Sequence, residues 1–275
     1  MISSKINYLS QKSKWVWNET LKIHKEATET RIASSISPIE IFVTLFYGNI
    51  LNFFPKDPLS KSRDRFVISK GHGSISMYPI LSDLGFINPT ELTKVCKRGG
   101  ILGGIPDPTV PGYETINGSL GHGLGVAAGM ALALKRKNED NSVFVLVGDG
   151  ELHEGSNWEA IMFANHHELD NLNVIVDNNG ACMLGLTNDV LSHNKLDEKF
   201  TAFGWDCQVV NGHDVNSLFN VFSAMKIKKT NRPKVIIAET IKGRGLPGIE
   251  NKPLAHIMNP SHELIDSLLD YDTKE

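Results

Sequence analysis

The sequence has few cysteines, no long apolar run and no excess of charge of either sign. Cys96, Cys182 and Cys207 are an odd number at wide spacing in 275 residues, which argues against a disulfide framework and suits a reducing compartment. No apolar stretch reaches the roughly 18 residues of a membrane-spanning helix, and residues 1–20 lack the apolar core of a signal peptide. With 28 Lys and Arg against 31 Asp and Glu, the basic surplus of a dedicated nucleic-acid binder is missing too. We therefore expect a cytoplasmic, globular protein.

The sequence also lacks internal repeats, low-complexity tracts and any Pro- or Ser-rich linker that would separate two domains. A single domain over residues 1–275 is the simplest expectation for this length. Glycine is in mild excess, with 24 of 275 residues, where an average composition has about 7%.

Short β-branched runs alternate with longer helical stretches. Because the runs are apolar without alternation, they indicate a mostly parallel sheet covered by helices on both faces, a doubly wound α/β fold. The expected strands are 66–69, 143–147, 173–177, 205–210 and 235–239, and the expected helices are 38–47 (with Ser37 as N-cap), 120–136, 157–169 and 215–227. Ligands of such folds bind beyond the carboxyl ends of the strands.

Two loops that follow expected strands carry the first candidate chemistry. The segment GDGE at 148–151 has glycines that let the backbone turn sharply and approach an anion closely. Asp149 lies between these glycines, and Asn179 follows the next strand, where the sequence reads DNNG at 177–180. If the two strands are adjacent and parallel, Asp149 and Asn179 converge at one edge of the sheet. A carboxylate, an amide oxygen, a backbone carbonyl and phosphate oxygens of a ligand would suit a hard octahedral cation.

These loops resemble the thiamine-diphosphate motif of transketolases, which begins with GDG and ends with an Asn pair or Asp-Asn. Four further segments resemble transketolase segments: SKGHG at 69–73, GSLGHG at 118–123, GW at 204–205 with NGHD at 211–214, and KGRG at 242–245. Five separated motifs in the right order make the match specific. The chain resembles, in length, the N-terminal subunit of a split transketolase.

The resemblance implies two cofactors, thiamine diphosphate and Mg²⁺. Asp149, Asn179 and the backbone carbonyl of Ala181 would ligate the metal. His72 would lie at the diphosphate as a catalytic residue, and Glu154 would reach across an interface toward a partner domain. The implied cofactor contacts are His72, Gly118, Leu120, Gly148, Asp149, Gly150, Glu151, Asn179 and Lys242. Taken without the resemblance, His72 between two glycines reads as an exposed turn histidine. His213 in NGHD most simply orders its loop.

Two positions depart from the family pattern where the substrate is handled. Arg31 stands in place of a histidine of the S-G-H-P-G segment, and Ile105 in place of a histidine of G-H-P-[DE]. Isoleucine can neither hydrogen-bond nor transfer protons, so polar recognition at that position is lost. Arg31 can still donate hydrogen bonds and suits an anionic group such as a phosphate or carboxylate. We assign both residues to the substrate site.

The family places a separate pyrimidine-binding domain beside the cofactor, and that domain supplies the glutamate that activates the aminopyrimidine. Because 275 residues leave no room for it, we expect this chain to be inactive alone. The resemblance implies an α₂β₂ assembly with a C-terminal transketolase-like subunit, transferring a two-carbon ketol unit between sugar phosphates.

Three other functions stay open from the sequence. The enzyme could use an altered donor or acceptor in the synthesis of branched or modified sugars, which Arg31 and Ile105 favour slightly. It could be the α subunit of a 2-oxoacid dehydrogenase E1, although SKGHG, GSLGHG and KGRG favour transketolase. It could also be a non-catalytic relic that only binds a partner. The intact Asp149, Gly150 and Asn179 argue against this last alternative.

Overall fold

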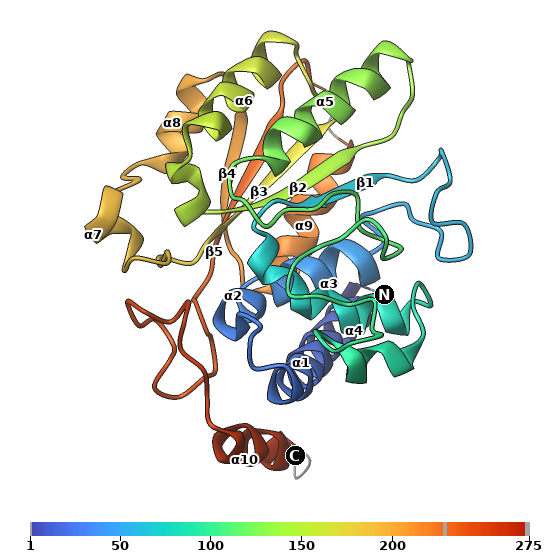
Figure 1. Cartoon of the computed structure of the whole chain (residues 1–275). Helices are drawn as coiled ribbons and strands as arrows, with labels where there is room; N and C mark the ends of the chain where they lie inside the picture. The colour runs from blue at the N-terminus through green and yellow to red at the C-terminus, as the bar shows by residue number, and fades with distance from the viewer. Residues whose placement is uncertain (1, 228–229, 273–275) are drawn as a thin grey trace.

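A parallel sheet of five strands forms the centre of the computed structural model, which describes residues 2–227 and 230–272 (Figure 1). The spatial order is β1-β2-β3-β5-β4, and every pair of neighbours is parallel. The strands are β1 (Arg65–Ile68), β2 (Val143–Gly148), β3 (Leu172–Asn178), β4 (Asp206–Asn211) and β5 (Lys234–Glu239). The expected single domain of residues 1–275 includes positions 1, 228–229 and 273–275, which lie outside the described residues.

Alternate side chains of the strands enter two separate hydrophobic cores, one on each face of the sheet. In β2, Phe144 and Leu146 belong to the larger core, whereas Val143, Val145 and Val147 belong to the smaller one. Both faces of β2 are therefore buried, which explains why its sequence is an unbroken apolar run. The edge strand β4 is mostly exposed or half-buried.

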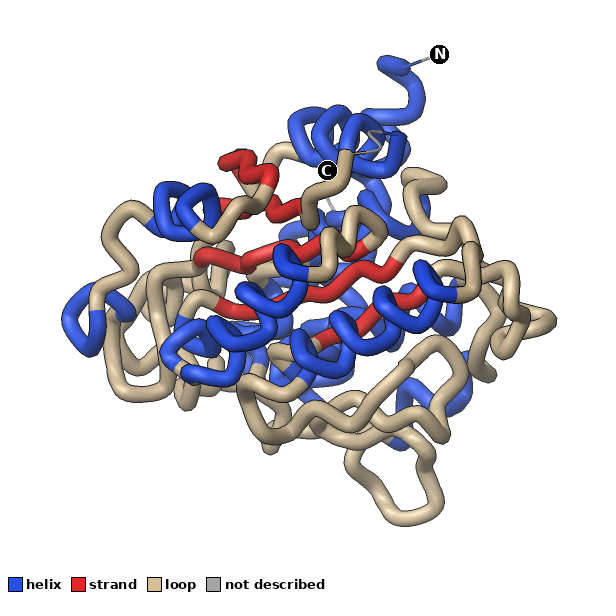
Figure 2. The backbone as a smooth tube through the Cα atoms, turned by 90° about the horizontal axis from the view of Figure 1, so that it is seen from above, coloured by secondary structure: helices blue, strands red, loops and turns tan. Residues whose placement is uncertain are grey.

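Helices cover each face of the sheet, as Figure 2 shows from above. The larger core is formed with α1 (Ile2–Glu26), α2 (Ile32–Ile36), α3 (Ile39–Tyr47), α4 (Met77–Asp83), α9 (Val215–Ile227) and α10 (His262–Asp272). The smaller core is formed with α5 (Gly123–Arg136), α6 (Gly155–His166) and α8 (Leu196–Ala202). Short elements complete the chain: α7 (Thr187–Leu191) and the 3₁₀ turns η1 (Gly71–Ser76), η2 (Pro89–Lys94) and η3 (Gly150–His153). The predicted doubly wound α/β fold is confirmed.

Ser37 is not the N-cap of α3, and that expectation was wrong. The cap position is Pro38, with no side-chain hydrogen bond to the helix. The Ser37 hydroxyl instead donates to the buried carboxylate of Asp177, 2.6 Å away. Hydrogen bonds to a charged acceptor are about twice as strong as neutral ones, so the Asp177 carboxylate fixes the Ser37 hydroxyl in this orientation.

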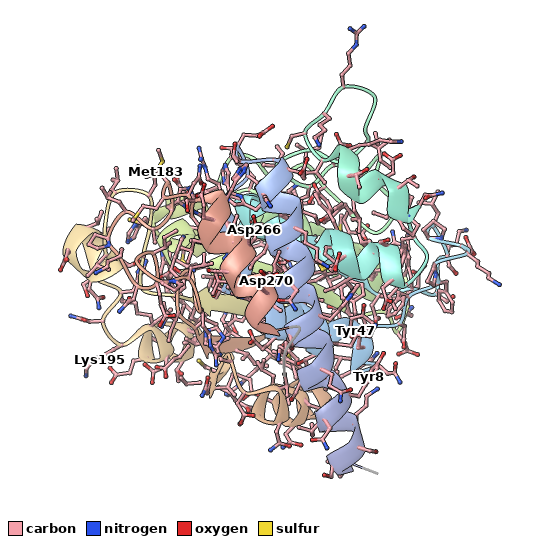
Figure 3. The ribbon with its side chains drawn as sticks, turned by 90° about the horizontal axis from the view of Figure 1, so that it is seen from below. Tyr8, Tyr47, Met183, Lys195, Asp266 and Asp270 are labelled. Carbon is pink, nitrogen blue, oxygen red and sulfur yellow. The ribbon has the colours of Figure 1, made fainter. Side chains whose placement is uncertain are left out.

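The first and last helices, α1 and α10, lie side by side, as Figure 3 shows from below. Lys25 near the end of α1 forms an ion pair with Asp266 of α10. At the other end of α1, Tyr8 packs edge-on against Tyr47 of α3, with ring centroids 6.0 Å apart. In the described part of the chain, no helix combines the length and apolarity needed to cross a membrane.

The connections of the sheet open a crevice between the carboxyl ends of β1 and β2. The chain leaves β1 toward η1 and α4 in the larger core, but leaves β2 toward η3 and α6 in the smaller core. Two neighbouring strands whose loops diverge to opposite faces define a topological switch point, where ligands of doubly wound folds bind.

Candidate functional site

A cavity of about 310 Å³ lies at this crevice and gathers residues from every glycine-rich motif. Ten of the predicted site residues line it: His72, Leu120, Gly148, Asp149, Gly150, Glu151, Glu154, Asn179, Ala181 and Lys242. Ser34, Lys70, His153, His256 and the segment 182–184 complete the wall. Segments that are far apart in the sequence therefore form one site.

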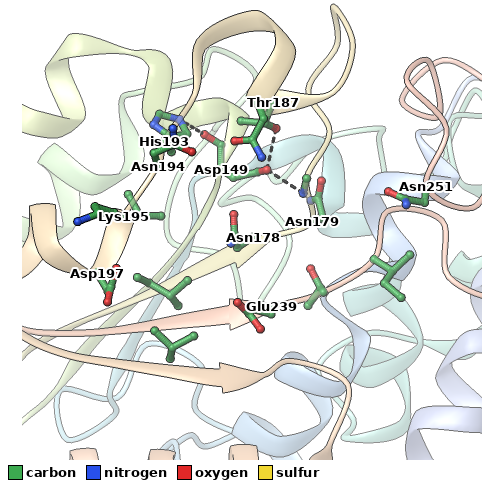
Figure 4. A pocket seen from close by; sticks show the side chains of 17 residues that line it. Asp149, Asn178, Asn179, Thr187, His193, Asn194, Lys195, Asp197, Glu239 and Asn251 are labelled. Carbon is green, nitrogen blue, oxygen red and sulfur yellow. Dashed lines mark hydrogen bonds between the residues drawn. The ribbon is translucent and has the colours of Figure 1, made fainter.

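Asp149 and Asn179 come together as the adjacent parallel strands β2 and β3 predicted. One Asp149 carboxylate oxygen accepts hydrogen bonds from the Gly180 amide at 2.9 Å and from the Thr187 hydroxyl at 2.8 Å. The Asp149 backbone carbonyl contacts His193 Nε2 at 2.9 Å. Figure 4 shows Asp149 between Thr187 and His193. Burial raises the pKa of Asp149, and the Thr187 hydrogen bond partly opposes this shift.

The three expected metal ligands form a donor set suited to Mg²⁺. Asn179 donates its amide nitrogen to Asp177 at 3.1 Å, which fixes the orientation of its amide oxygen. That oxygen also accepts from the Ala181 amide at 3.2 Å, and Asn179, Asp149 and Ala181 all line the same cavity. Among the described residues, no three His, Cys, Asp or Glu side chains cluster as a metal site. One carboxylate with two neutral oxygens fits a hard cation that also binds phosphate oxygens, as Mg²⁺ commonly does.

Asp177 connects Asn179, an expected metal ligand, to three other parts of the chain. Its side chain is fully buried and pairs with Lys70, while accepting hydrogen bonds from Ser37 and Thr240. Burial opposes ionisation of Asp177, but Lys70 and these hydroxyls outweigh burial and lower its pKa. The carboxylate is therefore ionised and holds Asn179 and Lys70 in place.

Part of the cavity wall is formed by buried lysines and by two histidines whose pKa values are lowered. Lys242 is 4% exposed; its Nζ donates to the Ala181 carbonyl at 3.2 Å. Burial, together with repulsion from Lys70, lowers the pKa of Lys242 to about 8. Burial and then Lys242 lower the pKa of His256 to about 3. His72 packs edge-on against His256, and its pKa is lowered by burial and by Arg31. A bound diphosphate would relieve the repulsion among these groups.

The Glu151 carboxylate forms hydrogen bonds with other segments of the chain. It accepts hydrogen bonds from the Ser69 hydroxyl, from the Gly121 amide at 3.0 Å and from the Gly148 amide at 3.2 Å. Burial raises its pKa, and these donors oppose the shift. Glu151 lines the cavity, and its side chain holds SKGHG, GSLGHG and GDG together.

Close backbone contacts explain part of the glycine excess. A Cβ on Gly71 would lie 1.6 Å from the Asn117 carbonyl oxygen, and one on Gly150 would lie 2.6 Å from Cys182 Cβ. Both are far below van der Waals contact, so only glycine fits at these two positions.

Three predicted residues lie outside the cavity wall: Gly118, Ile105 and Arg31. Gly118 and Ile105 are neighbours, since a Cβ on Gly118 would lie 3.0 Å from Ile105 Cδ1. Arg31 precedes α2 and is close enough for its charge to lower the pKa values of His72 and His256. Glu154 lines the cavity and its side chain is exposed, as a residue facing a partner would be.

Sequence reasoning missed Lys70, His256 and Ser34. Lys70 lies within the SKGHG segment, where the histidine is the more conspicuous candidate. Ser34 reaches His256 Nδ1 at 3.1 Å, although 222 positions separate the two residues. No local pattern marks His256, because the segment 246–260 belongs to no regular element.

A second, more polar pocket of about 490 Å³ lies on the other side of Asp149, between the carboxyl ends of β3 and β5 (Figure 4). Asp149, Asn179 and Thr187 line it together with Asn178, Lys195 and Glu239. The metal-ligand candidates therefore separate two pockets.

Comparison with known proteins agrees with this geometry. The family described as "Transketolase, thiamine diphosphate binding domain" matches residues 25–267. The chain belongs to this family. It is 37% identical over 238 residues to a protein of Actinobacillus succinogenes that is named as one subunit of an apulose-4-phosphate transketolase, covering 86% of this chain and 85% of that protein. It is 36% identical over 258 residues to the protein of the same name from Phocaeicola vulgatus, covering 89% and 91%.

Among solved structures, transketolase from Campylobacter jejuni superposes with a TM-score of 0.87 at 26% identity. The superposition covers 96% of this chain but 42% of that one, so the chain matches less than half of the solved enzyme. The fold is thus that of the thiamine-diphosphate-binding part of a transketolase, a family of thiamine-diphosphate-dependent transferases.

Proposed function

We propose that this chain, acting as one domain over residues 1–275, is the diphosphate- and metal-binding subunit of a transketolase-like enzyme. The observation that carries the proposal is the cavity between β1 and β2. There the oxygens of Asp149, Asn179 and Ala181 lie beside the buried cations Lys70 and Lys242. Oxygen ligands for a hard cation next to the buried ammonium group of Lys242 suit a Mg²⁺-bound diphosphate.

Each residue has a distinct task in this proposal. Asp149, Asn179 and the Ala181 carbonyl would hold Mg²⁺, and Lys242 and the Gly150 backbone would contact the diphosphate. His72, held neutral by burial and nearby cations, can accept or donate a proton at the substrate side. Thiamine diphosphate, when bound, supplies the electron sink that stabilises a carbanion beside the substrate carbonyl.

The proposed reaction is transfer of a two-carbon ketol unit between sugar phosphates. Two relatives that cover most of this chain are named as subunits of an apulose-4-phosphate transketolase. Their names support apulose 4-phosphate as one substrate. Arg31 and Ile105 near the site also support an altered donor or acceptor, because one adds a cation and the other removes a polar group.

A second chain completes the active site in this proposal. The names of both relatives designate one subunit of a larger enzyme, which supports a partner chain, and the exposed Glu154 at the cavity supports contact across an interface. We propose a C-terminal transketolase-like subunit with a pyrimidine-binding domain, in an α₂β₂ assembly in the cytoplasm. A 2-oxoacid dehydrogenase E1 or a relic is less well supported, since these relatives are transketolases and the metal ligands are intact.

Reconstitution tests the proposal. The chain is mixed with the C-terminal subunit encoded nearest to it, thiamine diphosphate and Mg²⁺. Transfer is then assayed from xylulose 5-phosphate or from apulose 4-phosphate to an aldose phosphate. We expect turnover that needs both subunits and both cofactors, and faster turnover with apulose 4-phosphate than with xylulose 5-phosphate. Equal rates with xylulose 5-phosphate would contradict the altered substrate, and turnover without thiamine diphosphate would contradict the function.

A further inference from the structure

The NGHD segment, which the proposed function leaves unused, contacts the segment that carries Lys242. We propose that His213 is a positioning residue, which together with Glu40 of α3 fixes the backbone just before Lys242 and so aims Lys242 into the cavity. This inference rests on the proposed role of Lys242 in binding the diphosphate.

Hydrogen bonds define the orientation of the His213 ring. The Ile241 amide donates to His213 Nε2 at 2.8 Å. An accepting Nε2 carries no proton, so the neutral ring is protonated at Nδ1, which lies 3.1 Å from Glu40 Oε2 and donates to it. The ring is 6% exposed, and both of its nitrogens have partners. Its own loop is fixed by donation of the His213 amide to Asn211 Oδ1 at 2.9 Å.

Ile241 directly precedes Lys242, so the hydrogen bond fixes the chain on the N-terminal side of that lysine. On the C-terminal side, the Gly243 amide donates to the Ala33 carbonyl at 3.2 Å and Trp17 Nε1 donates to the Arg244 carbonyl at 3.2 Å. Lys242 between these anchors is left with little freedom, and its Nζ reaches the Ala181 carbonyl at 3.2 Å. Residues that orient a site residue in this way contribute to binding without touching the ligand.

His213 lies behind the site. It lines a separate groove of about 360 Å³ with Glu40, Trp17 and Arg244, whereas Lys242 lines the cavity with Asp149 and Asn179. The groove residues include none of the predicted metal or diphosphate contacts. His213 therefore acts through Lys242 and not on the cofactor.

Two substitutions separate positioning from mere packing. H213L fills a similar space but cannot accept from Ile241, whereas H213Q has an amide that can accept from Ile241 and donate to Glu40. In the Mg²⁺-loaded complex with the partner subunit, we expect H213L to weaken thiamine diphosphate binding about 10-fold, as loss of an orienting residue commonly does. H213Q should bind nearly as well as the wild type. Equal losses in the two variants would overturn the inference.

A double-mutant cycle tests the route through Lys242. If His213 acts through this lysine, H213L should weaken cofactor binding no further once Lys242→Met is present. The same additional loss in both backgrounds would overturn the inference. Exposed His166 on α6 supplies a matched control. H166Q should leave the affinity for thiamine diphosphate unchanged in both the wild-type and the Lys242→Met background.

Hydrogen exchange of the chain in the absence of cofactor provides a readout that does not depend on the proposed function. Amides 241–245 should exchange faster in H213L than in the wild type, and unchanged exchange there would overturn the inference. Wild-type protein that binds no thiamine diphosphate would instead contradict the proposed function, while the exchange measurement would still decide whether His213 holds the segment.

Discussion

At the carboxyl end of β3, one carboxylate orders side chains from four segments. Asp177 pairs with Lys70 and accepts hydrogen bonds from Ser37, Asn179 and Thr240. The sequence indicated the metal-ligand candidates near it, but not this network. Its partners lie up to 140 positions away along the chain, where no spacing rule applies. The candidate ligand-binding side chains lie in local sequence motifs. The buried residues that position these side chains often lie outside such motifs.

Removing the charge of Asp177 should destabilise the fold. In Asp177→Asn, Lys70 would remain buried without its counter-charge, and breaking one partner of a buried pair costs about 3 kcal/mol or more. Lys70→Met in the same chain should recover part of that free energy of unfolding, measured by urea denaturation. A double variant less stable than Asp177→Asn would contradict the assignment of the ion pair.

His24 makes the fold sensitive to acid. Its Nδ1 lies 2.7 Å from the Thr30 hydroxyl, which donates to the Ala27 carbonyl. His24 Nε2 is buried without a partner among the described residues. Burial lowers the pKa of His24 from 6.5 to about 4. Because the unfolded chain binds the proton first, stability should fall as pH drops from about 6.5 to about 4, by roughly 3 kcal/mol in total.

His24→Gln tests this pH dependence, because its amide can still donate to Thr30 but does not titrate. Unfolding free energies at pH 7, 6 and 5 should fall less steeply in this variant than in the wild type. His166→Gln on the surface should keep the wild-type slope. Parallel slopes for the wild type and His24→Gln would show that His24 is not the group responsible.

At the scale of elements, every strand end was predicted to within one residue. Four of the strands are buried apolar runs, whereas the edge strand β4 is mostly exposed or half-buried. The long helix α1 was not predicted. Its buried positions include Leu9, Val16 and Ile23, but Ser13 and Thr20 alternate with them on the same face. Because polar residues occupy part of the buried face, the apolar residues alone do not show the helical period. Thr20 satisfies its hydroxyl by donating to the Val16 carbonyl at 2.7 Å, which lets a polar residue occupy the core face.

The loop that carries Gly71 and the loop that carries Asn117 approach each other closely, so a methyl group at Gly71 should force them apart. Gly71→Ala would place its Cβ against the Asn117 carbonyl, and we expect it to destabilise the protein by about 3 kcal/mol, as overpacking does. Gly103→Ala is the matched control, because nothing lies within 4 Å of its added Cβ. Thermal unfolding compares the two variants, and equal midpoints would refute the tight contact at Gly71.

At the scale of the whole molecule, the fold brings four glycine-rich motifs, SKGHG, GSLGHG, GDG and KGRG, to one cavity. Adjacent parallel strands β2 and β3 place Asp149 beside Asn179, and the loop after β5 returns Lys242 to the same cavity. The sequence predicted this convergence because parallel strands share a direction. It did not predict that Arg31, Ile105 and Gly118 lie outside the cavity wall, since their segments belong to loops without a strand to fix them.

In the proposed function, this chain supplies the metal and diphosphate half of the active site. Calorimetric titration of thiamine diphosphate into the complex with the partner subunit, with and without Mg²⁺, tests it most directly. Wild-type protein should bind with Mg²⁺ and only weakly without it, Asp149→Asn should lose the Mg²⁺-dependent part, and exposed Asp189→Asn should behave as wild type. Binding by Asp149→Asn that still responds fully to Mg²⁺ would contradict the account.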